Sequence, residues 1–366
     1  MGRLVNFCAG ASKDVLPAHR VPAMLLSVPE YASTPNQIKT SQELLIAAGA
    51  REVILDSGGF QLWVAEGKGI CPTHDESRPV VFNDKEGNIA PSHVIKAAAL
   101  LKPTIMMALD FPIRTLSNPA EQQREFLRKL GYNAPWARKT ASLRQQFCPD
   151  IQLFLPVQCY NLRQFDQFID LLDGVTFDGL SMPIRNLRLR EIALFLIRFH
   201  QLGVRRVHIL GSTGFGIMAL AAYFARNFFD WVSVDATSWR LKAQYSDYLN
   251  PLDLSVEHLR DLASVDDSIQ MDCPCPWCRN KTFTYIKNLP YREKTDFLSC
   301  HNWWVTEQAA RDLYDHSGDV IELELFLRPR CRKPDLCNEI LRTLSLSHTL
   351  VSVERELWEP WMLGNS

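Results

Sequence analysis

The densest group of potential metal ligands in the 366-residue chain is a run of three cysteines within six residues, Cys273, Cys275 and Cys278. His301 follows further along the chain, and Cys300 stands directly before it. Three thiolates and one imidazole complete a tetrahedral zinc shell without an open position, which is typical of a structural site. We therefore expect a structural Zn²⁺ on the three cysteines and His301, with Cys300 as the rival fourth ligand.

A second group of reactive side chains stands where short apolar segments end. Asp56, Asp110 and Asp235 each close such a segment, and Gln158 closes another. A single aspartate at the end of a strand more often caps a helix or a turn. Several polar endings in one chain instead indicate a shared pocket, in which two carboxylates can divide the work of nucleophile and proton donor.

Glycines follow two of the apolar segments, 52–56 and 206–211, and a further segment carries an aspartate. The pair Gly58-Gly59 either lets the backbone approach a ligand closely or forms a tight turn. Gly211-Ser-Thr-Gly214 either holds a phosphate on its N–H groups or simply begins a helix. The segment 177–182 carries Asp178, which we also expect at a polar strand ending.

The apolar segments have the pattern of buried strands that alternate with helices. Near-continuous hydrophobicity is expected of a parallel sheet with helices on both faces. The expected strands span residues 4–9, 23–28, 52–56, 104–110, 151–158, 177–182, 206–211 and 231–235, and the expected helices span 41–50, 91–101, 119–147, 162–172, 187–202 and 215–228. Eight strands favour an α/β fold of the (β/α)8 TIM-barrel type, with catalytic groups at the C-terminal strand ends. A doubly wound open sheet is the alternative.

The pattern changes after the last expected strand. We predict a catalytic barrel over residues 1–250, and a zinc-binding subdomain with a C-terminal helical region over residues 251–366. The basic run at residues 328–333 either contacts phosphates or is a solvated charged surface. The connection over residues 62–90 is expected to be a surface loop, whose Cys71 and His74 lack partner ligands.

Composition limits the class of protein. Hydrophobic residues make up 46% of the chain and charged residues 22%, which argues against disorder. The formal net charge of −1 excludes a protein that coats nucleic acid through bulk positive charge. The sequence has no apolar run of the roughly 18 residues that a membrane helix needs and begins without the pattern of a signal peptide. With cysteines in metal-ligand spacing, we expect no membrane association and a cytoplasmic location.

Two motifs together resemble the tRNA-guanine transglycosylase superfamily. They are Asp56-Ser-Gly-Gly-Phe-Gln61 and the cysteine cluster with its histidine, and the resemblance spans about residues 50–305. Members of that superfamily are zinc-bearing (β/α)8 barrels that exchange a guanine in a polynucleotide for a 7-deazaguanine. The resemblance therefore implies a pentosyltransferase, a glycosyltransferase of the guanine transglycosylase type.

The resemblance also assigns a role to each matching position. Asp56 matches the general acid/base, and Asp235 matches a nucleophile that traps the oxocarbenium-like C1′, as in retaining glycosidases. The positions that match contacts to the base are Ser57, Phe60, Asp110, Gln158, Gly179 and Leu180. The positions that match the zinc ligands are Cys273, Cys275, Cys278 and His301.

One aspartate competes with Asp235 for the role of nucleophile. Asp230 lies in Phe-Phe-Asp-Trp, and the superfamily motif often reads Phe-Asp. Asp230 would begin the last strand, whereas Asp235 would end it at the catalytic face of a barrel. We therefore assign the nucleophile to Asp235.

Departures from the bacterial tRNA enzymes point to another polymer. Asp235-Ala-Thr-Ser-Trp239 replaces their Pro-Thr-Arg continuation and resembles a DNA-guanine transglycosylase branch, and Gly179-Leu-Ser-Met-Pro-Ile184 replaces their Gly-Leu-Ala-Val-Gly-Glu. We therefore expect insertion into DNA of a 7-deazaguanine such as 7-cyano-7-deazaguanine. The alternatives are a tRNA-guanine transglycosylase of the queuosine or archaeosine type, a non-catalytic partner subunit of one, and a zinc-stabilised nucleic-acid-binding module. A homodimer and accessory modification proteins stay open as further partners.

Overall fold

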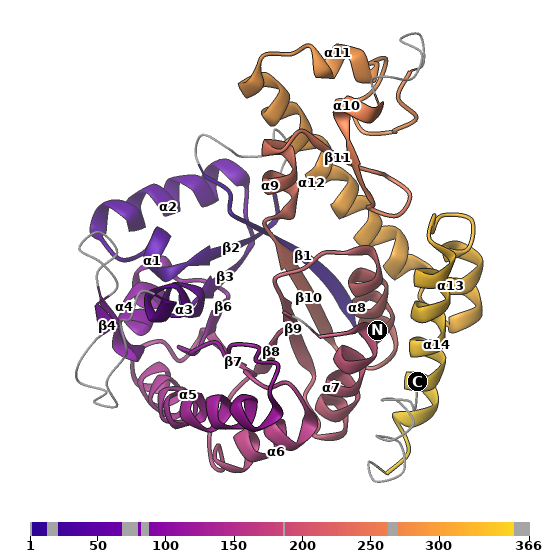
Figure 1. Cartoon of the computed structure of the whole chain (residues 1–366). Coiled ribbons are helices and arrows are strands. Elements are labelled where there is room, and N and C mark those ends of the chain that lie inside the picture. The colour runs from indigo at the N-terminus through magenta and orange to yellow at the C-terminus, as the bar shows by residue number, and fades with distance from the viewer. Residues whose placement is uncertain are drawn as a thin grey trace. The chain divides into compact units, whose positions relative to one another are not determined.

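Eight parallel strands close into a barrel. The computed structural model describes residues 2–12, 21–67, 80–81, 88–185, 187–262 and 270–354. The order of the strands around the barrel is β1-β10-β9-β8-β7-β6-β3-β2 (Figure 1). They are β1 (Arg3–Ala9), β2 (Ala23–Ser27), β3 (Glu52–Asp56), β6 (Ile105–Met107), β7 (Gln152–Pro156), β8 (Gly179–Pro183), β9 (Arg206–Leu210) and β10 (Trp231–Ala236). The closed barrel confirms the predicted (β/α)8 fold, and the doubly wound sheet was the wrong alternative.

The chain forms two compact units. The first, called here the central unit, comprises Pro22–Leu187 and Leu202–His208. The second, called the terminal unit, comprises Met1–Val21, Arg188–Gln201 and Ile209–Ser366. The predicted boundary at residue 250 stays a prediction.

The helices of the central unit begin and end at recognisable signals. They are α1 (Val28–Tyr31), α2 (Pro35–Ala48), α3 (Gly59–Gly67), α4 (Pro91–Leu101), α5 (Pro119–Phe147) and α6 (Leu162–Asp170), with the short strands β4 (Val80–Val81) and β5 (Asn88–Ile89). The α2 helix begins before the predicted residue 41, because Thr34 and Gln37 cap its first turn reciprocally. Asn118 caps α5, and its side chain accepts from two backbone N–H groups. Cys71 and His74 lie outside the described residues.

The terminal unit carries the remaining helices. They are α7 (Leu189–Gln201), α8 (Phe215–Asn227), α9 (Ser238–Gln244), α10 (Leu259–Leu262), α11 (Phe283–Lys287), α12 (Tyr291–Asp315), α13 (Val320–Leu327) and α14 (Pro334–Leu350), with the hairpin β11 (Asp247–Leu249) and β12 (Val256–His258). The long helix α12 packs against α8, α9 and β1. The indole of Trp239 on α9 donates to the Ala9 carbonyl at 3.0 Å, which ties α9 to the end of β1. None of the described helices has the length and apolar character that crossing a bilayer requires.

Three predicted strand endings need correction. The strand predicted over residues 104–110 is β6, which stops at Met107, so Asp110 lies in the segment that follows it. The strand predicted over residues 151–158 is β7, which stops at Pro156, so Gln158 also lies beyond its strand. Asp178 precedes β8 and is not at its C-terminal end. Its carboxylate forms an ion pair with Arg144 and accepts from the Leu153 backbone N–H at 2.8 Å, so Asp178 holds neighbouring elements together.

Candidate active site

A buried carboxylate lies at the centre of the polar group in the central unit. Asp110 is only 6% exposed. The Ser57 hydroxyl donates to Asp110 Oδ1 at 2.9 Å, and Gln158 Nε2 donates to Asp110 Oδ2 at 2.5 Å. These three residues follow β3, β6 and β7, so segments far apart in the sequence meet here. We refer to Ser57, Asp110 and Gln158 as the Asp110 cluster.

Two glycines let the chain pass close to this carboxylate. A Cβ atom on Gly59 would lie 2.4 Å from Asp110 Oδ1, so no larger residue fits there without displacing the carboxylate. Gly58 has φ +97°, a conformation that favours glycine, and a Cβ on it would lie 2.5 Å from Pro29 Cγ. The Gly58 N–H points to Asp56 Oδ2 at 3.3 Å. The tight turn therefore contacts both carboxylates, Asp56 through the Gly58 N–H and Asp110 at Gly59.

Burial governs the protonation of the central carboxylate. It raises the pKa of Asp110 to about 6, against the lowering effect of the hydrogen bonds from Gln158 and Ser57 and of the Lys129 charge. At neutral pH the group is therefore mostly an acceptor-only carboxylate. Below pH 6 it gains a proton and can no longer accept two N–H donors.

The α5 helix supports the segment after Asp110, and sequence reasoning missed this support. Asn133 Oδ1 accepts from the Phe111 N–H at 2.6 Å, and Asn133 Nδ2 donates to the Phe111 carbonyl at 3.2 Å. One turn earlier on α5, the fully buried Lys129 Nζ lies 2.8 Å from the centre of the Phe111 ring. It also donates to Glu66 of α3 at 2.7 Å. The signal that could have indicated this support is a lysine and an asparagine four residues apart on the apolar face of α5.

The other predicted base contacts lie on α3 and β8. Phe60 is the second residue of α3 and is 51% exposed. Gly179 and Leu180 are the first two residues of β8, where they pair with Phe154 and Leu155 of β7 and are buried. A Cβ on Gly179 would lie 2.6 Å from the Phe154 ring, so this position also requires glycine.

The terminal unit holds the predicted nucleophile. Asp235 is the penultimate residue of β10 and is 6% exposed. Its Oδ1 accepts from the Gly211 N–H at 2.9 Å, so this N–H is not available to a phosphate. Asp230 is exposed and directly precedes β10. The two aspartates thus stand at opposite ends of the strand, which is the placement on which their assignment was based.

The four predicted metal ligands come together in the terminal unit. The donor atoms of Cys273, Cys275, Cys278 and His301 all lie within 4.8 Å of one another, and all four residues are buried. The three sulfurs lie 3.6, 3.4 and 3.2 Å from His301 Nδ1. Ideal tetrahedral zinc bonds place sulfur about 3.6 Å from nitrogen, so the donor set fits a zinc ion.

The orientation of the histidine agrees with a ligand role. His301 Nε2 lies 2.9 Å from the Leu249 carbonyl oxygen, which directs Nδ1 toward the sulfurs. The Tyr248 ring stacks on the imidazole with the ring centres 4.0 Å apart. Cys300 is buried but is not part of the four-residue donor group, so the rival fourth ligand is not supported.

Comparison with known proteins supports one superfamily. No family model matches the chain. Over 104 residues the chain is 31% identical to the tRNA-guanine(15) transglycosylase of Thermococcus onnurineus (strain NA1). The chain is therefore similar to a tRNA-guanine transglycosylase. The matched segment is 28% of this chain and only 16% of that enzyme. This match supports the transglycosylase superfamily that the motifs at Asp56 and Cys273 indicate, and it does not distinguish a DNA branch.

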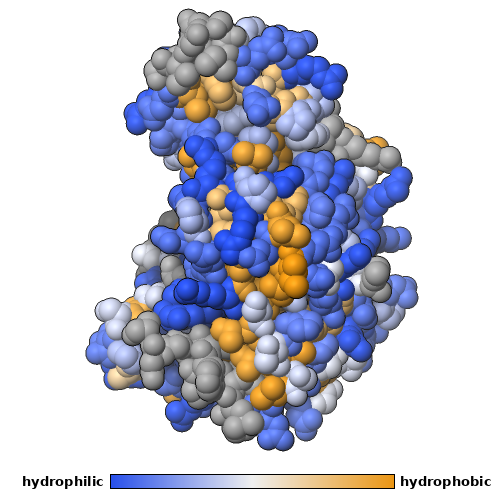
Figure 2. Space-filling view, turned by 90° about the vertical axis from the view of Figure 1, so that its right-hand side faces the viewer, coloured by the Kyte–Doolittle hydropathy of each residue, from blue (hydrophilic) through white to orange (hydrophobic). Residues whose placement is uncertain are grey.

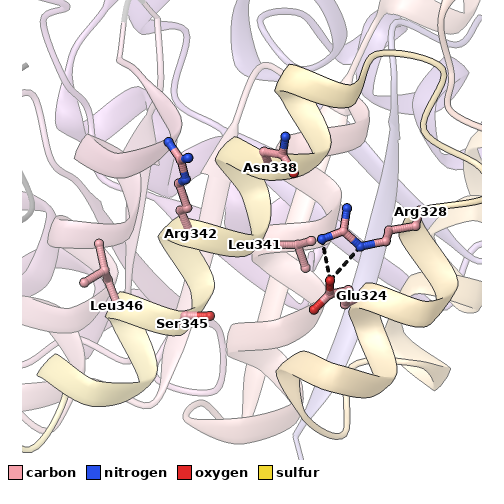
Figure 3. A pocket seen from close by; sticks show the side chains of 7 residues that line it. All are labelled: Glu324, Arg328, Asn338, Leu341, Arg342, Ser345 and Leu346. Atoms are coloured by element: carbon pink, nitrogen blue, oxygen red, sulfur yellow. Dashed lines mark hydrogen bonds and ion pairs between the residues drawn. The ribbon is translucent and has the colours of Figure 1, made fainter.

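The basic run of the sequence is partly neutralised in the terminal unit. Arg328 lies 2.5 Å from Glu324, and Arg332 forms an ion pair with Glu257. The guanidinium of Arg330 lies 3.9 Å from the centre of the Phe326 ring. An open hollow of about 550 Å³ beside Arg328 is lined by Glu324, Arg328, Asn338, Leu341, Arg342, Ser345 and Leu346 (Figure 3). With two arginines paired, the run offers less positive charge to a phosphate backbone than its sequence implies.

The same helices expose hydrophobic side chains. Ile321 and Leu325 on α13 are both 71% exposed, and Leu346 on α14 is 38% exposed. Figure 2 shows hydrophobic residues in a band on the face that carries α13 and α14. Such a band is typical of a contact surface.

Proposed function

We propose that the chain is a guanine transglycosylase that exchanges a guanine base in a nucleic acid for a 7-deazaguanine through a covalent aspartyl intermediate. The Asp110 cluster is the observation that carries the proposal, because it offers a buried carboxylate next to a glycine turn and a second aspartate. The similarity to a tRNA-guanine transglycosylase supports the same reaction class.

The Asp110 cluster suits the donor edge of guanine. Guanine presents N1–H and the exocyclic amine as neighbouring donors, with the O6 acceptor beside them. The Asp110 carboxylate would accept both donors, and the Gln158 amide would turn its N–H from Asp110 to O6. The ring of Phe60 would stack on the base, whereas the contact of Gly179 and Leu180 with the base stays a prediction from the motif, because these two residues begin β8 rather than end it.

Two carboxylates would divide the bond changes. A carboxylate oxygen of Asp235 attacks C1′ while the bond from C1′ to the guanine nitrogen breaks and its electron pair leaves with the base. Asp56, as the carboxylic acid, gives its proton to the departing guanine and becomes a carboxylate.

The second half of the reaction reverses these steps with another base. The incoming 7-deazaguanine loses its N9 proton to Asp56, and N9 attacks C1′ as the bond between C1′ and the Asp235 oxygen breaks. Both aspartates return to their starting state, so the exchange consumes no further reactant.

A zinc ion on the Cys3His group would act as a structural cross-link. Its four protein ligands leave no open position, so it would supply stability rather than chemistry. Cys273, Cys275 and Cys278 come from the segment before α11, and His301 comes from α12. The ion would therefore hold this segment against the helix.

We propose DNA as the polymer, with tRNA as the second candidate. The segment Asp235-Ala-Thr-Ser-Trp239 favours DNA, since it resembles the DNA-acting branch. The match to an archaeal enzyme named for tRNA favours tRNA. A nucleic-acid substrate together with reduced cysteines would place the enzyme in the cytoplasm.

Guanine exchange tests the function and the polymer together. The protein is incubated with radiolabelled guanine and either duplex DNA or unmodified tRNA, and label in the polymer is counted. Incorporation into DNA alone supports the proposal, and incorporation into tRNA alone supports the second candidate. Asp110→Asn provides the control, because it keeps the shape of the site and removes the carboxylate. No incorporation into either polymer under conditions in which the protein binds free guanine would contradict the exchange reaction.

A further inference from the structure

Two aromatic rings and one arginine form an ordered array beside the Asp110 cluster. Phe60 and Trp63 lie three residues apart on α3, and their rings stack with centres 5.8 Å apart and planes inclined by 29°. The Arg185 guanidinium lies 4.9 Å from the centre of the Trp63 ring and 5.7 Å from that of Phe60. Phe60 and Arg185 are exposed, and Trp63 is partly exposed. We call these three residues the stacking platform.

The platform belongs to the same end of the strands as the Asp110 cluster. The α3 helix follows β3 directly after the Asp56 turn, and Arg185 lies two residues beyond the end of β8. Burial raises the pKa of Tyr160, the second residue beyond Gln158, and the nearby charge of Arg185 opposes this increase. All of these residues are in the central unit.

Arg185 has no ion-pair partner among the residues that the structure describes, since none of their Asp or Glu oxygens lies within ion-pair distance of its guanidinium. The cation–π contact with Trp63 holds the guanidinium in place without using its N–H donors. An exposed arginine held in this way can bind an anion at a fixed position.

We propose that Trp63 and Arg185 bind the unpaired nucleotide next to the exchanged guanine. Trp63 stacks on the neighbouring base, and Arg185 binds its phosphate. This inference rests on the proposed function, since it extends the base site along the polymer. The combination of an aromatic surface with an arginine suits single-stranded nucleic acid, in which bases are free to stack. In a duplex the bases are paired and stacked on one another, so the guanine and its neighbour would have to leave the stack before they reach this site.

Binding of a stem–loop oligonucleotide tests the proposal. The probe has one guanine in its loop and is made as RNA and as DNA, and affinity is measured by fluorescence anisotropy. Two further versions lack the base on the 5′ or the 3′ side of the guanine. Trp63→Ala should weaken binding of the complete probe about 10-fold, the usual loss for one stacked base. Wild type should bind one of the two abasic probes about 10-fold more weakly than the complete probe. On that abasic probe, Trp63→Ala should bind as tightly as wild type does.

Arg185 is tested through the salt dependence of the same binding. Arg185→Ala should reduce the slope of log affinity against log salt by about 0.7, the value for one phosphate contact on a single strand. The matched controls are Phe147→Ala and Arg205→Ala, because both side chains are exposed and precede strands of the same unit rather than following them. Both controls should bind as wild type. Trp63→Phe should restore most of the affinity, since it keeps an aromatic face.

Free guanine separates failure of the platform from failure of the proposed function. Its binding is measured by equilibrium dialysis for wild type and for the Trp63 and Arg185 variants. If wild type binds no guanine, the proposed function is wrong. If guanine binds but the Trp63→Ala and Arg185→Ala variants bind the oligonucleotides as wild type does, the platform alone is wrong. Equal losses on the complete and the abasic probes would also overturn it, since no base then contacts Trp63.

Discussion

Guanine binding should depend on pH through the Asp110 carboxylate. Burial raises its pKa to about 6, so the group is about nine-tenths ionised at pH 7 and about one-tenth ionised at pH 5. Only the ionised form accepts from both N1–H and the exocyclic amine of guanine. The affinity for guanine should therefore be high above pH 6 and should decrease as the pH falls through 6. The affinity for guanine should decrease about 10-fold between pH 7 and pH 5.

Substitution of the same group gives the matching test. Asp110→Asn keeps the size of the side chain but removes the charge, and hydrogen bonds to a charged group contribute about 2 kcal/mol. The variant should bind guanine about 30-fold more weakly at pH 7 and should lose the pH dependence. Asp230→Asn serves as control, because this exposed aspartate lies in the other unit.

Equilibrium dialysis with radiolabelled guanine from pH 5 to pH 8 measures both effects. Guanine does not titrate in this range, so a change in affinity reports on the protein. A flat profile for wild type would refute the role of Asp110 as the reader of the base. A pH dependence that persists in Asp110→Asn would assign the titration to another group.

Three further perturbations test the supports of the two sites. Cys275→Ala should lose the metal and lower the melting temperature, whereas Cys300→Ala should keep the metal content measured by mass spectrometry, because Cys300 is outside the donor set. Gly59→Ala should abolish most guanine binding, since its Cβ would lie 2.4 Å from the Asp110 carboxylate. Gly67→Ala on the same helix should bind guanine normally, because its Cβ would lie 3.6 Å from the nearest atom. Lys129→Met should move the midpoint of guanine binding to higher pH, because the lysine charge lowers the pKa of the buried aspartate; an unmoved midpoint would contradict this coupling.

Local sequence signals predicted much of the fold. The predicted bounds of β3, α4 and α5 agree with the structure, because an apolar run or a proline at the first turn marks each of these elements. The metal ligands could also be predicted from the sequence, since three cysteines within six residues already indicate a site. The end of β6 could not be predicted locally, because the Asn133 side chain that holds Phe111 lies 22 residues further along the chain.

The supports of the candidate site depend on contacts that no local pattern contains. Glu66 and Lys129 are 63 residues apart and meet only when α3 and α5 pack together. The stacking of Arg185 on Trp63 likewise requires the ends of β3 and β8 to converge. Sequence reasoning therefore indicated the residues of the Asp110 cluster from motifs but missed the residues that hold or extend it.

Formation of a covalent adduct tests the central claim most directly. Wild type and the three variants Asp235→Asn, Asp56→Asn and Asp230→Asn are incubated with DNA and with tRNA, denatured, and separated by gel electrophoresis. The account predicts a denaturant-resistant adduct for wild type and Asp230→Asn and none for Asp235→Asn, because an amide is a poor nucleophile. Asp56→Asn should bind the polymer but fail in guanine exchange, because the leaving base receives no proton. An adduct in Asp235→Asn together with none in Asp230→Asn would contradict the assignment of the nucleophile.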